Sequence, residues 1–238
     1  AASAAPRALR ISTAGGSREL IDVLVGEVWL CAGQSNMEWP LARELHAEAE
    51  LPRASHPGIR IFNPGYAGKG AGGSPFAAEE MAMLTPAGYY RGAWEVCTPG
   101  SAARMSAIGY YAARDLHAAL GVPIGIIHLA VGGSPVEAWV RRETLAGDPA
   151  LRVLTESDWL MNPALEAWCR QRGQENLGPA PASAADGGGP DHPFKPGFLW
   201  DAGIEPLLPF GLRGVMWYQG ESNSLSLARV QQHEILLP

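Results

Sequence analysis

An apolar run at residues 23–32 is the feature that most constrains this chain, because it ends directly in Gly-Gln-Ser-Asn-Met at residues 33–37. A run so continuously apolar is typical of a strand that is buried on both faces of a sheet. Gly33 allows the backbone to turn sharply where this strand ends. We therefore predict that Ser35 lies at the carboxyl edge of the sheet, where open α/β folds bind their ligands.

Two further apolar runs end in the same way. Residues 123–131 lead into Gly132 and Gly133, and residues 215–218 lead into the polar segment 219–223. Other predicted elements are strands at 59–62 and 94–96, a helix at 101–120, partly helical structure at 38–51 and a last helix at 229–237. Alternating strands and helices predict an α/β fold with a parallel central sheet. In such a sheet the three polar strand ends share one edge.

The remaining segments give weaker signals. Residues 1–21 suggest short strands without a partner, and residues 173–197, rich in Pro, Gly and Ala, are predicted to form a long surface loop. Three glycines within residues 65–75 match the dinucleotide motif G-x-G-x-x-G. That motif needs a strand, a tight turn and a helix in direct succession. Residues 65–75 are therefore predicted to be a flexible loop.

Composition narrows the possible partners. The chain has 238 residues, a net charge of −6 and 47 % hydrophobic residues, enough for a sizeable core. No cluster of Lys and Arg stands out, which argues against binding to nucleic acid or to an anionic membrane surface. No apolar stretch reaches the roughly 20 residues of a membrane-spanning helix. The three cysteines are widely spaced and form no metal-binding pattern.

Ser35 taken alone has two interpretations. A serine in a turn after a strand is commonly a residue that only forms hydrogen bonds within its own loop. The position also suits a nucleophile, because it presents a hydroxyl at the ligand-binding edge of the sheet. The residue at position 37 is Met and not Gly, so the segment is not the G-x-S-x-G of ordinary α/β-hydrolase lipases. Neither an HExxH motif nor a Walker loop is present.

Four segments together resemble the sialate O-acetylesterases and related carbohydrate acetyl esterases of the SGNH hydrolase superfamily. They occur in the family's order and extend over about residues 22–223. The segments are VLVGEVWLCAGQSNME at 23–38, SAIGY at 106–110 with GVPIG at 121–125, GGSPVEAW at 132–139, and WYQGESN at 217–223. The resemblance implies a three-layer α/β/α sandwich and hydrolysis of O-acetyl esters on carbohydrates. It implies no metal and no cofactor.

The resemblance also implies roles for individual residues. Ser35 is expected to be the nucleophile, and the backbone N–H of Gly133 is expected to bind the oxyanion. Either Gln219 or Asn223 is expected to supply a side-chain amide to the same oxyanion, with Gln219 favoured because it directly follows the strand. Donors fixed in advance at a developing oxyanion are worth roughly 3–4 kcal/mol each. The substrate-binding candidates are Gln34, Asn36 and Glu221.

The sequence after residues 219–223 lacks the Asp and His that the resemblance leads us to expect. Family members carry an Asp-x-x-His after the last strand, and no such motif follows Asn223 in this sequence. We therefore expect the catalytic Asp and His beyond residue 238. His192, after Asp191, and His233 are alternative bases. The domain organisation predicted is a remnant of a preceding β-rich segment at 1–21 and an SGNH-type esterase domain, incomplete at its C-terminal end, at 22–238.

Two functional hypotheses remain open at this point. The first is an O-acetylesterase, and the second is a non-catalytic remnant, lacking the Asp–His pair, that binds a sugar or another partner. The composition, rich in Ala, Gly, Pro and Arg, is typical of a bacterial protein. Relatives that act on glycans are mostly exported or lysosomal, which favours a periplasmic or secreted location. The sequence does not determine the oligomeric state, the sugar or the acetyl position.

Overall fold

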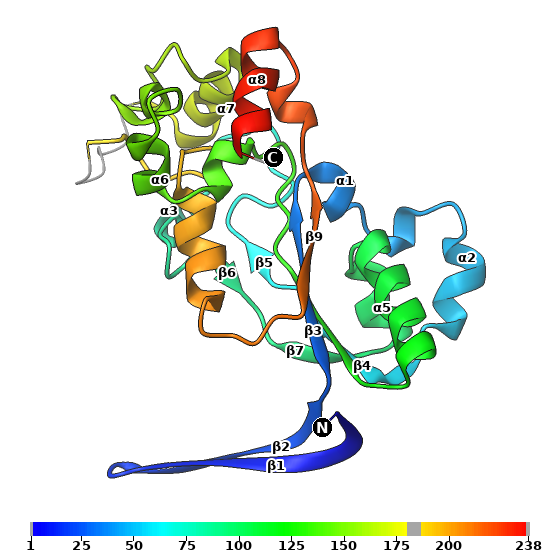
Figure 1. Ribbon diagram of the computed structural model, residues 1–238. Coiled ribbons are helices and arrows are strands. Elements are labelled where there is room, and N and C mark those ends of the chain that lie inside the picture. The colour runs from blue at the N-terminus through cyan, green and yellow to red at the C-terminus, as the bar shows by residue number, and fades with distance from the viewer. Residues whose placement is uncertain (1, 180–186, 237–238) are drawn as a thin grey trace.

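Most of the apolar run forms a strand that lies between two parallel neighbours in the main sheet. In the computed structural model, which describes residues 2–179 and 187–236, β3 (Glu27–Gly33) pairs in parallel with β8 (Ile124–His128) and β9 (Gly214–Tyr218). The main sheet has five strands in the order β7-β4-β8-β3-β9 (Figure 1). The carboxyl ends of β3, β8 and β9 therefore lie at one edge, as the sequence predicts.

The other elements surround this sheet or project from it. The remaining strands are β1 (Ser3–Thr13), β2 (Gly16–Val25), β4 (His56–Phe62), β5 (Gly65–Tyr66), β6 (Tyr90–Arg91) and β7 (Trp94–Cys97). The α-helices are α1 (Ser35–Glu38), α2 (Ala47–Glu50), α3 (Ala78–Met83), α4 (Pro99–Arg104), α5 (Ala107–Leu120), α6 (Arg142–Gly147), α7 (Ala167–Leu177) and α8 (Leu227–Leu236). No helix in the described part of the chain is both long and apolar enough to span a membrane.

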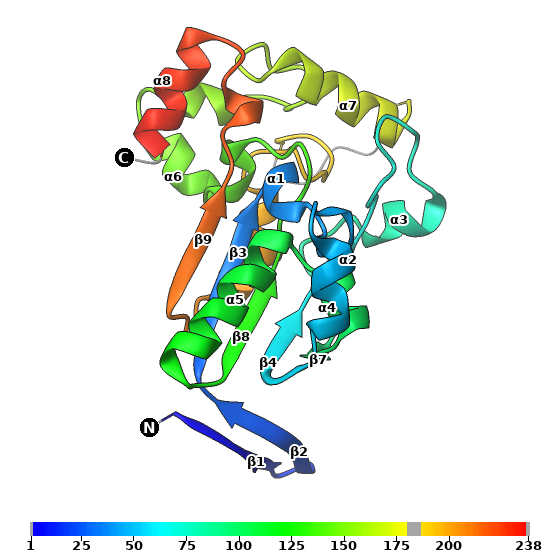
Figure 2. The ribbon, with the colours of Figure 1, turned by 90° about the vertical axis from the view of Figure 1, so that its right-hand side faces the viewer.

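Each face of the sheet is covered by its own hydrophobic core. Along β3, Cys31 packs into the core beneath α5, whereas Leu30 and Ala32 face the opposite core. Ile126 and Ile127 of β8 divide between the two cores in the same way, because successive strand residues point to opposite faces. The views in Figures 1 and 2 place α5 over one face and the segment that contains α6 over the other. The expected three-layer α/β/α sandwich is confirmed.

The sheet differs from the prediction at both edges. It is mixed and not wholly parallel, because β7 runs antiparallel to β4. Strand β9 is predicted from its apolar run to be buried, which is wrong: Val215 is 54 % exposed, Tyr218 is also exposed, and the other three residues are half-buried. In the described part of the chain no strand pairs with the outer side of β9. An apolar run therefore indicated a strand correctly without indicating its place in the sheet.

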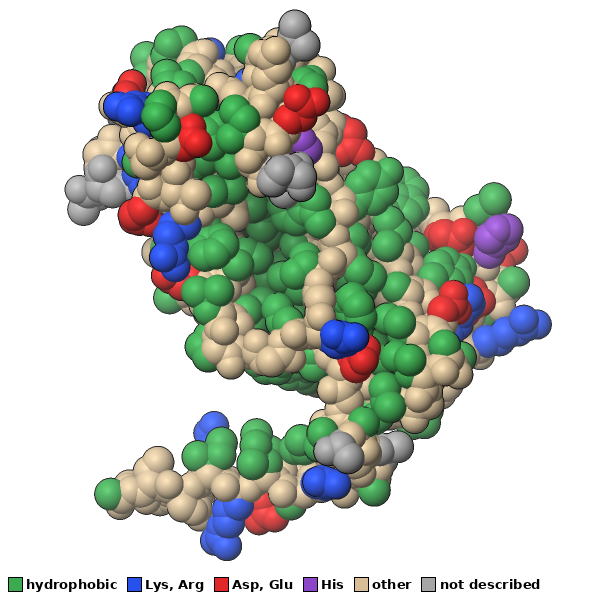
Figure 3. All heavy atoms as spheres, viewed as in Figure 1, with side chains coloured by type: hydrophobic (Ala, Val, Ile, Leu, Met, Phe, Trp, Pro, Cys, Tyr) green, Lys and Arg blue, Asp and Glu red, His purple; other side chains and the backbone are tan. Residues whose placement is uncertain are grey.

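The predicted strand at residues 23–32 is divided at Gly26. Residues 23–25 end β2, which pairs antiparallel with β1 in a separate two-stranded hairpin. The hairpin projects from the body of the molecule below the amino ends of β3 and β9 (Figures 1 and 2), and the space-filling view shows it standing clear (Figure 3). Residues 1–21 are expected to form short strands without a partner; in the structure β1 and β2, which begins at Gly16, lie largely within this segment and pair with each other.

Two other expectations are corrected within the body. The helix predicted over residues 101–120 is two helices, α4 and α5, and the Ser106 hydroxyl between them accepts the N–H of Gly109 to begin α5. The predicted surface loop at 173–197 is largely buried at residues 188–190 and 192–197. Residues 180–186 of that loop lie outside the described residues. The Pro and Gly content of this segment indicates the absence of a long helix, but it does not determine burial. Burial depends on apolar side chains such as that of Phe194.

The contrast between the central and edge strands predicts a stability difference. Ile126 is 1 % exposed in β8, so Ile126→Ala is expected to lower the unfolding free energy by about 2–5 kcal/mol. Val215→Ala on the exposed edge strand is the control and is expected to change it by about 0.5 kcal/mol or less. Urea unfolding followed by circular dichroism measures both. Equal losses in the two variants would contradict the described sheet order.

Candidate active site

Ser35 begins the short helix α1 immediately after β3. Its side chain is exposed and lines a pocket of about 920 Å³. Other residues of the pocket wall include Glu38, Tyr66, Gly132, His192 and Phe194. No hydrogen bond of the Ser35 hydroxyl is found within residues 2–179 and 187–236. The hydroxyl is thus placed at the open carboxyl edge of the sheet with its hydrogen-bonding capacity unused.

The loop after β9 is attached directly to the loop that carries Ser35. The side-chain oxygen Oε1 of Gln34 accepts the N–H of Gly220 at 3.4 Å and of Ser222 at 3.2 Å. On the other side of Ser35, the Asn36 amide donates to the carboxylate of Glu221. The three predicted substrate-binding residues, Gln34, Asn36 and Glu221, therefore hold these two loops together. Gln34 is buried, whereas Asn36 and Glu221 are exposed.

The loop after β8 is held from both sides. The Ser222 hydroxyl donates to the carbonyl oxygen of Gly133 at 3.0 Å, and the N–H of Gly132 donates to Oε2 of Glu38 at 2.7 Å. Gly133 has a φ of +77°, a conformation that favours glycine. Within the described residues the backbone N–H groups of Ser35 and Gly133 donate no hydrogen bond. These N–H groups belong to adjacent loops and are available to an acceptor.

The two predicted amide donors, Gln219 and Asn223, contact the segment that follows this turn. Nε2 of Gln219 donates to Oδ1 of Asn223 at 2.6 Å and to the carbonyl oxygen of Ser134 at 3.3 Å. Oδ1 of Asn223 also accepts the N–H of Val136, and its Nδ2 donates to Glu137. Both hydrogens of the Gln219 amide are thus engaged, while one hydrogen bond of Asn223 Nδ2 is found within the described residues. Neither residue is in the pocket wall described above.

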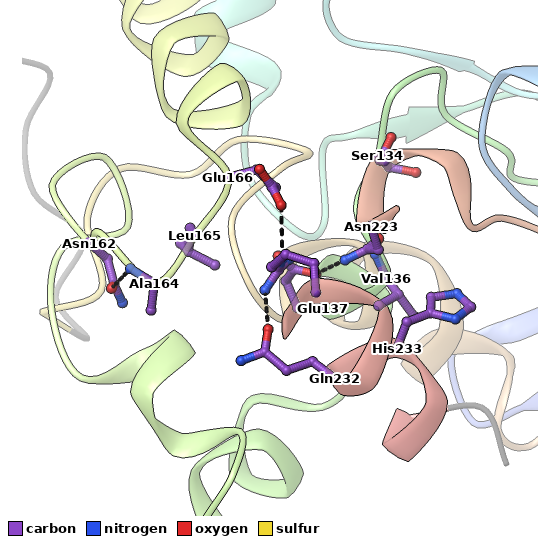
Figure 4. A network of polar contacts seen from close by, with 12 residues as sticks. Ser134, Val136, Glu137, Asn162, Ala164, Leu165, Glu166, Asn223, Gln232 and His233 are labelled. Carbon is purple, nitrogen blue, oxygen red and sulfur yellow. Dashed lines mark hydrogen bonds and ion pairs between the residues drawn. The ribbon is translucent and has the colours of Figure 1, made fainter. Parts of the chain in front are cut away.

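A buried cluster of charged side chains contacts the amide of Asn223. Glu137 is bonded by Asn223 at 2.8 Å and by the guanidinium of Arg229 from α8 (Figure 4). Arg229 is 5 % exposed and also contacts Glu166 at 3.4 Å and Gln232 at 2.6 Å. Two carboxylates therefore flank one buried guanidinium, which limits the cost of removing these charges from water.

The two candidate histidine bases are both engaged elsewhere. His192 stacks between Phe76 and Trp159; its Nδ1 accepts the N–H of Phe194, and its Nε2 lies 3.2 Å from Oδ1 of Asn176. Because Nδ1 accepts, Nε2 carries the proton and donates. Burial, with a smaller contribution from Arg172, lowers the pKa of His192 to about 3, so the ring binds a proton poorly.

His233 of α8 makes a different contact. Its Nε2 lies 3.0 Å from Oε1 of Gln219, at the end of β9. Neither His192 nor His233 has a hydrogen bond to Ser35 among the described residues. Within the same residues no group of three or more His, Cys, Asp or Glu side chains forms a candidate metal site.

Sequence reasoning missed Glu38, Tyr66 and the pair Glu137–Arg229. Glu38 lies three residues after Ser35, a spacing that puts both residues on one side of a helical turn, and this spacing is the signal that identifies it. A carboxylate inside the apolar segment 135–139 is a comparable signal for Glu137, because a buried charge needs a partner. No local pattern identifies Arg229 as that partner.

The chain is similar in sequence to known proteins. The chain is 31 % identical over 211 residues to the sialate O-acetylesterase of Mus musculus and 32 % identical over 206 residues to that of Homo sapiens. Each alignment covers 85 % of this chain, which spans about a third of the length of these curated relatives, 36 % and 32 % respectively. No family model matches the chain.

A solved structure extends the similarity to the fold. The crystal structure of a carbohydrate acetylesterase from Xanthomonas citri matches with a TM-score of 0.64 and 30 % identity, over 98 % of this chain and 41 % of that chain. The fold and the serine-bearing edge define an α/β/α domain of the SGNH-hydrolase class. Within that class, the chain belongs to the family of the sialate O-acetylesterases and related carbohydrate acetylesterases.

The buried histidine predicts a pH dependence of stability. The folded-state pKa of His192, about 3, lies below its ordinary value of 6.5, so on acidification the unfolded chain binds the proton first. Stability is expected to fall as the pH drops below 6.5, by about 1.4 kcal/mol per pH unit for this residue. His192→Asn keeps an acceptor for the Phe194 N–H and is expected to reduce that slope. Urea unfolding at pH 5, 6 and 7 measures it; an unchanged slope would contradict the prediction.

The pair Glu137–Arg229 predicts that a second substitution restores part of the stability lost through the first. Arg229→Met leaves Glu137 buried without its cation and is expected to cost about 3–5 kcal/mol of unfolding free energy. Adding Glu137→Gln removes the unpaired charge and is expected to restore part of that loss. A double-mutant cycle by chemical denaturation measures the coupling. Strictly additive losses would show that the two side chains do not depend on each other.

Proposed function

We propose that this chain carries the nucleophile and oxyanion donors of an esterase that removes O-acetyl groups from carbohydrates. The observation that carries the proposal is the environment of Ser35. Its hydroxyl faces a pocket of about 920 Å³, and the N–H groups of Ser35 and Gly133 have no acceptor among the described residues. Adjacent unbonded N–H groups beside a serine hydroxyl suit the addition of an alkoxide to an ester carbonyl.

The proposed chemistry follows from these groups. The Ser35 oxygen attacks the acetyl carbonyl carbon, and the carbonyl oxygen gains negative charge next to the two N–H donors. Donors of this kind are worth about 3–4 kcal/mol each in comparable sites. The reaction also needs a base for the hydroxyl proton. We propose the Asp–His pair implied by the family resemblance for this task, because both nitrogens of His192 are already engaged.

The pocket wall supports a carbohydrate as the alcohol part of the ester. Trp39, Tyr66, Phe76 and Phe194 contribute aromatic surface, which suits the apolar faces of sugar rings. Arg43, Lys69 and Arg172 add hydrogen-bond donors to the same wall. The relatives named above act, by their names, on sialate or carbohydrate acetyl esters. An O-acetylated sugar is therefore the proposed substrate class.

A second candidate function is sugar binding without turnover. It is favoured by one observation: in residues 2–179 and 187–236 no histidine is hydrogen-bonded to Ser35. A binding protein would use the same pocket and its aromatic wall but would release no acetate. The two candidates differ in whether the Ser35 hydroxyl reacts.

Replacing the serine tests the proposal. Ser35→Ala in the full-length protein is expected to reduce acetate release from an aryl acetate by at least about 1,000-fold, because the covalent step is lost. Folding is expected to be unaffected, since the side chain is exposed and its hydroxyl has no described hydrogen bond. Initial rates and circular dichroism measure the two effects.

Ser17→Ala in the exposed hairpin is the control and is expected to keep full activity. Full activity in Ser35→Ala would exclude Ser35 as the nucleophile. A wild-type protein that binds acetylated sugars by calorimetry, yet never releases acetate, would favour the binding function instead.

A further inference from the structure

Glu38 lies close to Ser35 but has no role in the reaction proposed above. Helix α1 places it three residues after Ser35, and both side chains line the same pocket. Oε2 of Glu38 accepts the N–H of Gly132 at 2.7 Å, a short contact between a carboxylate and a backbone donor. Residues 94 positions apart in the sequence are thereby joined at the centre of the site.

This hydrogen bond separates two neighbouring backbone donors. Gly132 gives its N–H to Glu38, whereas the next N–H in the chain, that of Gly133, has no acceptor among the described residues. The carbonyl of Gly133 is fixed separately by the Ser222 hydroxyl. The turn is thus held at one residue's N–H and at the next residue's carbonyl oxygen. The orientation of the free N–H between these two attachments is set by them.

The carboxylate of Glu38 is itself held in place. The Tyr66 hydroxyl donates to its Oε1 at 2.7 Å, and Nζ of Lys69 lies 3.6 Å from the same oxygen. Burial, and to a lesser degree the Glu38 charge, raise the pKa of Tyr66 well above its usual value, so the hydroxyl keeps its proton and remains a donor. Lys69 also lies over the Tyr66 ring, 5.2 Å from its centre. Glu38 therefore has little freedom to release Gly132.

The backbone of Gly132 is closely packed. A Cβ built on Gly132 would lie 2.9 Å from Oε2 of Glu38 and 3.9 Å from Cβ of Ser35. The backbone of Gly132 is consequently packed between the carboxylate and the candidate nucleophile. A shift of this backbone would move the Gly133 N–H relative to Ser35 directly.

We propose that Glu38 is a positioning residue: by holding the Gly132 N–H, with Tyr66 and Lys69 behind it, it directs the Gly133 N–H toward the ester oxygen bound at Ser35. The proposal rests on the proposed function, because it assumes that Gly133 serves the oxyanion. Glu38 touches neither the reacting carbonyl nor the proton of Ser35 in this role. Its effect is expected in the chemical step and not in sugar binding.

Removal of the carboxylate tests this role by kinetics. Glu38→Ala in the full-length protein is expected to lower kcat for an acetylated sugar about 10- to 100-fold, since loss of one oxyanion donor costs about 100- to 1,000-fold and here the donor is only displaced. KM is expected to change less than about 3-fold, because in the proposed role the carboxylate binds Gly132 and not the sugar. Glu38→Gln keeps an acceptor for Gly132 and is expected to recover most of kcat.

The chain contains a closely matched control. Glu44 also accepts a tyrosine hydroxyl, that of Tyr111 at 2.9 Å, and a backbone N–H, that of His46 at 2.8 Å. It is not part of the pocket wall. Glu44→Ala therefore removes the same kinds of hydrogen bond away from the site and is expected to leave kcat unchanged. An equal loss of kcat in Glu44→Ala and Glu38→Ala would overturn the proposal.

Hydrogen exchange of the backbone separates this inference from the proposed function. The amide of Gly132 is expected to exchange at least 10-fold faster in Glu38→Ala than in the wild type, and to be unaffected by Ser35→Ala. Unchanged exchange at Gly132 in Glu38→Ala, or fast exchange with wild-type kcat, would refute the positioning role. A wild-type protein without turnover would refute the proposed function, and with it the catalytic consequence of the Glu38–Gly132 hydrogen bond, whatever the exchange rates.

Discussion

The parallel pairing of β3 between β8 and β9 is the constraint on which the site depends. It brings three strand ends, separated by about ninety residues each, to the same edge of the sheet. The pairing leaves no space at its end: a Cβ on Gly33 would lie 2.1 Å from the carbonyl oxygen of Tyr218. The carbonyl of Gly33 meanwhile accepts the N–H of Val131 at 3.0 Å. Only a glycine lets the backbone before Ser35 contact both neighbouring strands this closely.

The loops beyond these strand ends are held mainly by polar side chains. Gln34 binds two N–H groups of the β9 loop, and Asn223 joins that loop to Val136 after β8. Such hydrogen bonds contribute about 1 kcal/mol each, but a partner left unsatisfied in the interior costs more. Buried polar groups therefore favour one arrangement of the loops over its alternatives. The pair Glu137–Arg229 extends this constraint to α8, whose His233 contacts Gln219.

The sequence predicted the parts of this structure that have a local pattern. Apolar runs followed by polar clusters predicted the strands β3, β8 and β9 and their shared edge. Patterns within a few residues do not report which strand lies at the outside, so the exposure of Val215 and the antiparallel direction of β7 were not predicted. The same holds for Glu137 and Arg229, 92 positions apart. The catalytic roles of Ser35 and Gly133 stay predictions, since their positions fit those roles without testing them.

The two consecutive glycines after β8, Gly132 and Gly133, are each needed for a different structural reason. At Gly132 the requirement is close approach, because an added Cβ would lie 2.9 Å from Oε2 of Glu38. At Gly133 the requirement is conformation, because its φ of +77° is rarely adopted by other residues. A sequence pattern shows the pair as a single tight turn. The structure separates a glycine that brings the backbone against Ser35 from one whose left-handed conformation turns the backbone, and the N–H of that second glycine has no acceptor among the described residues.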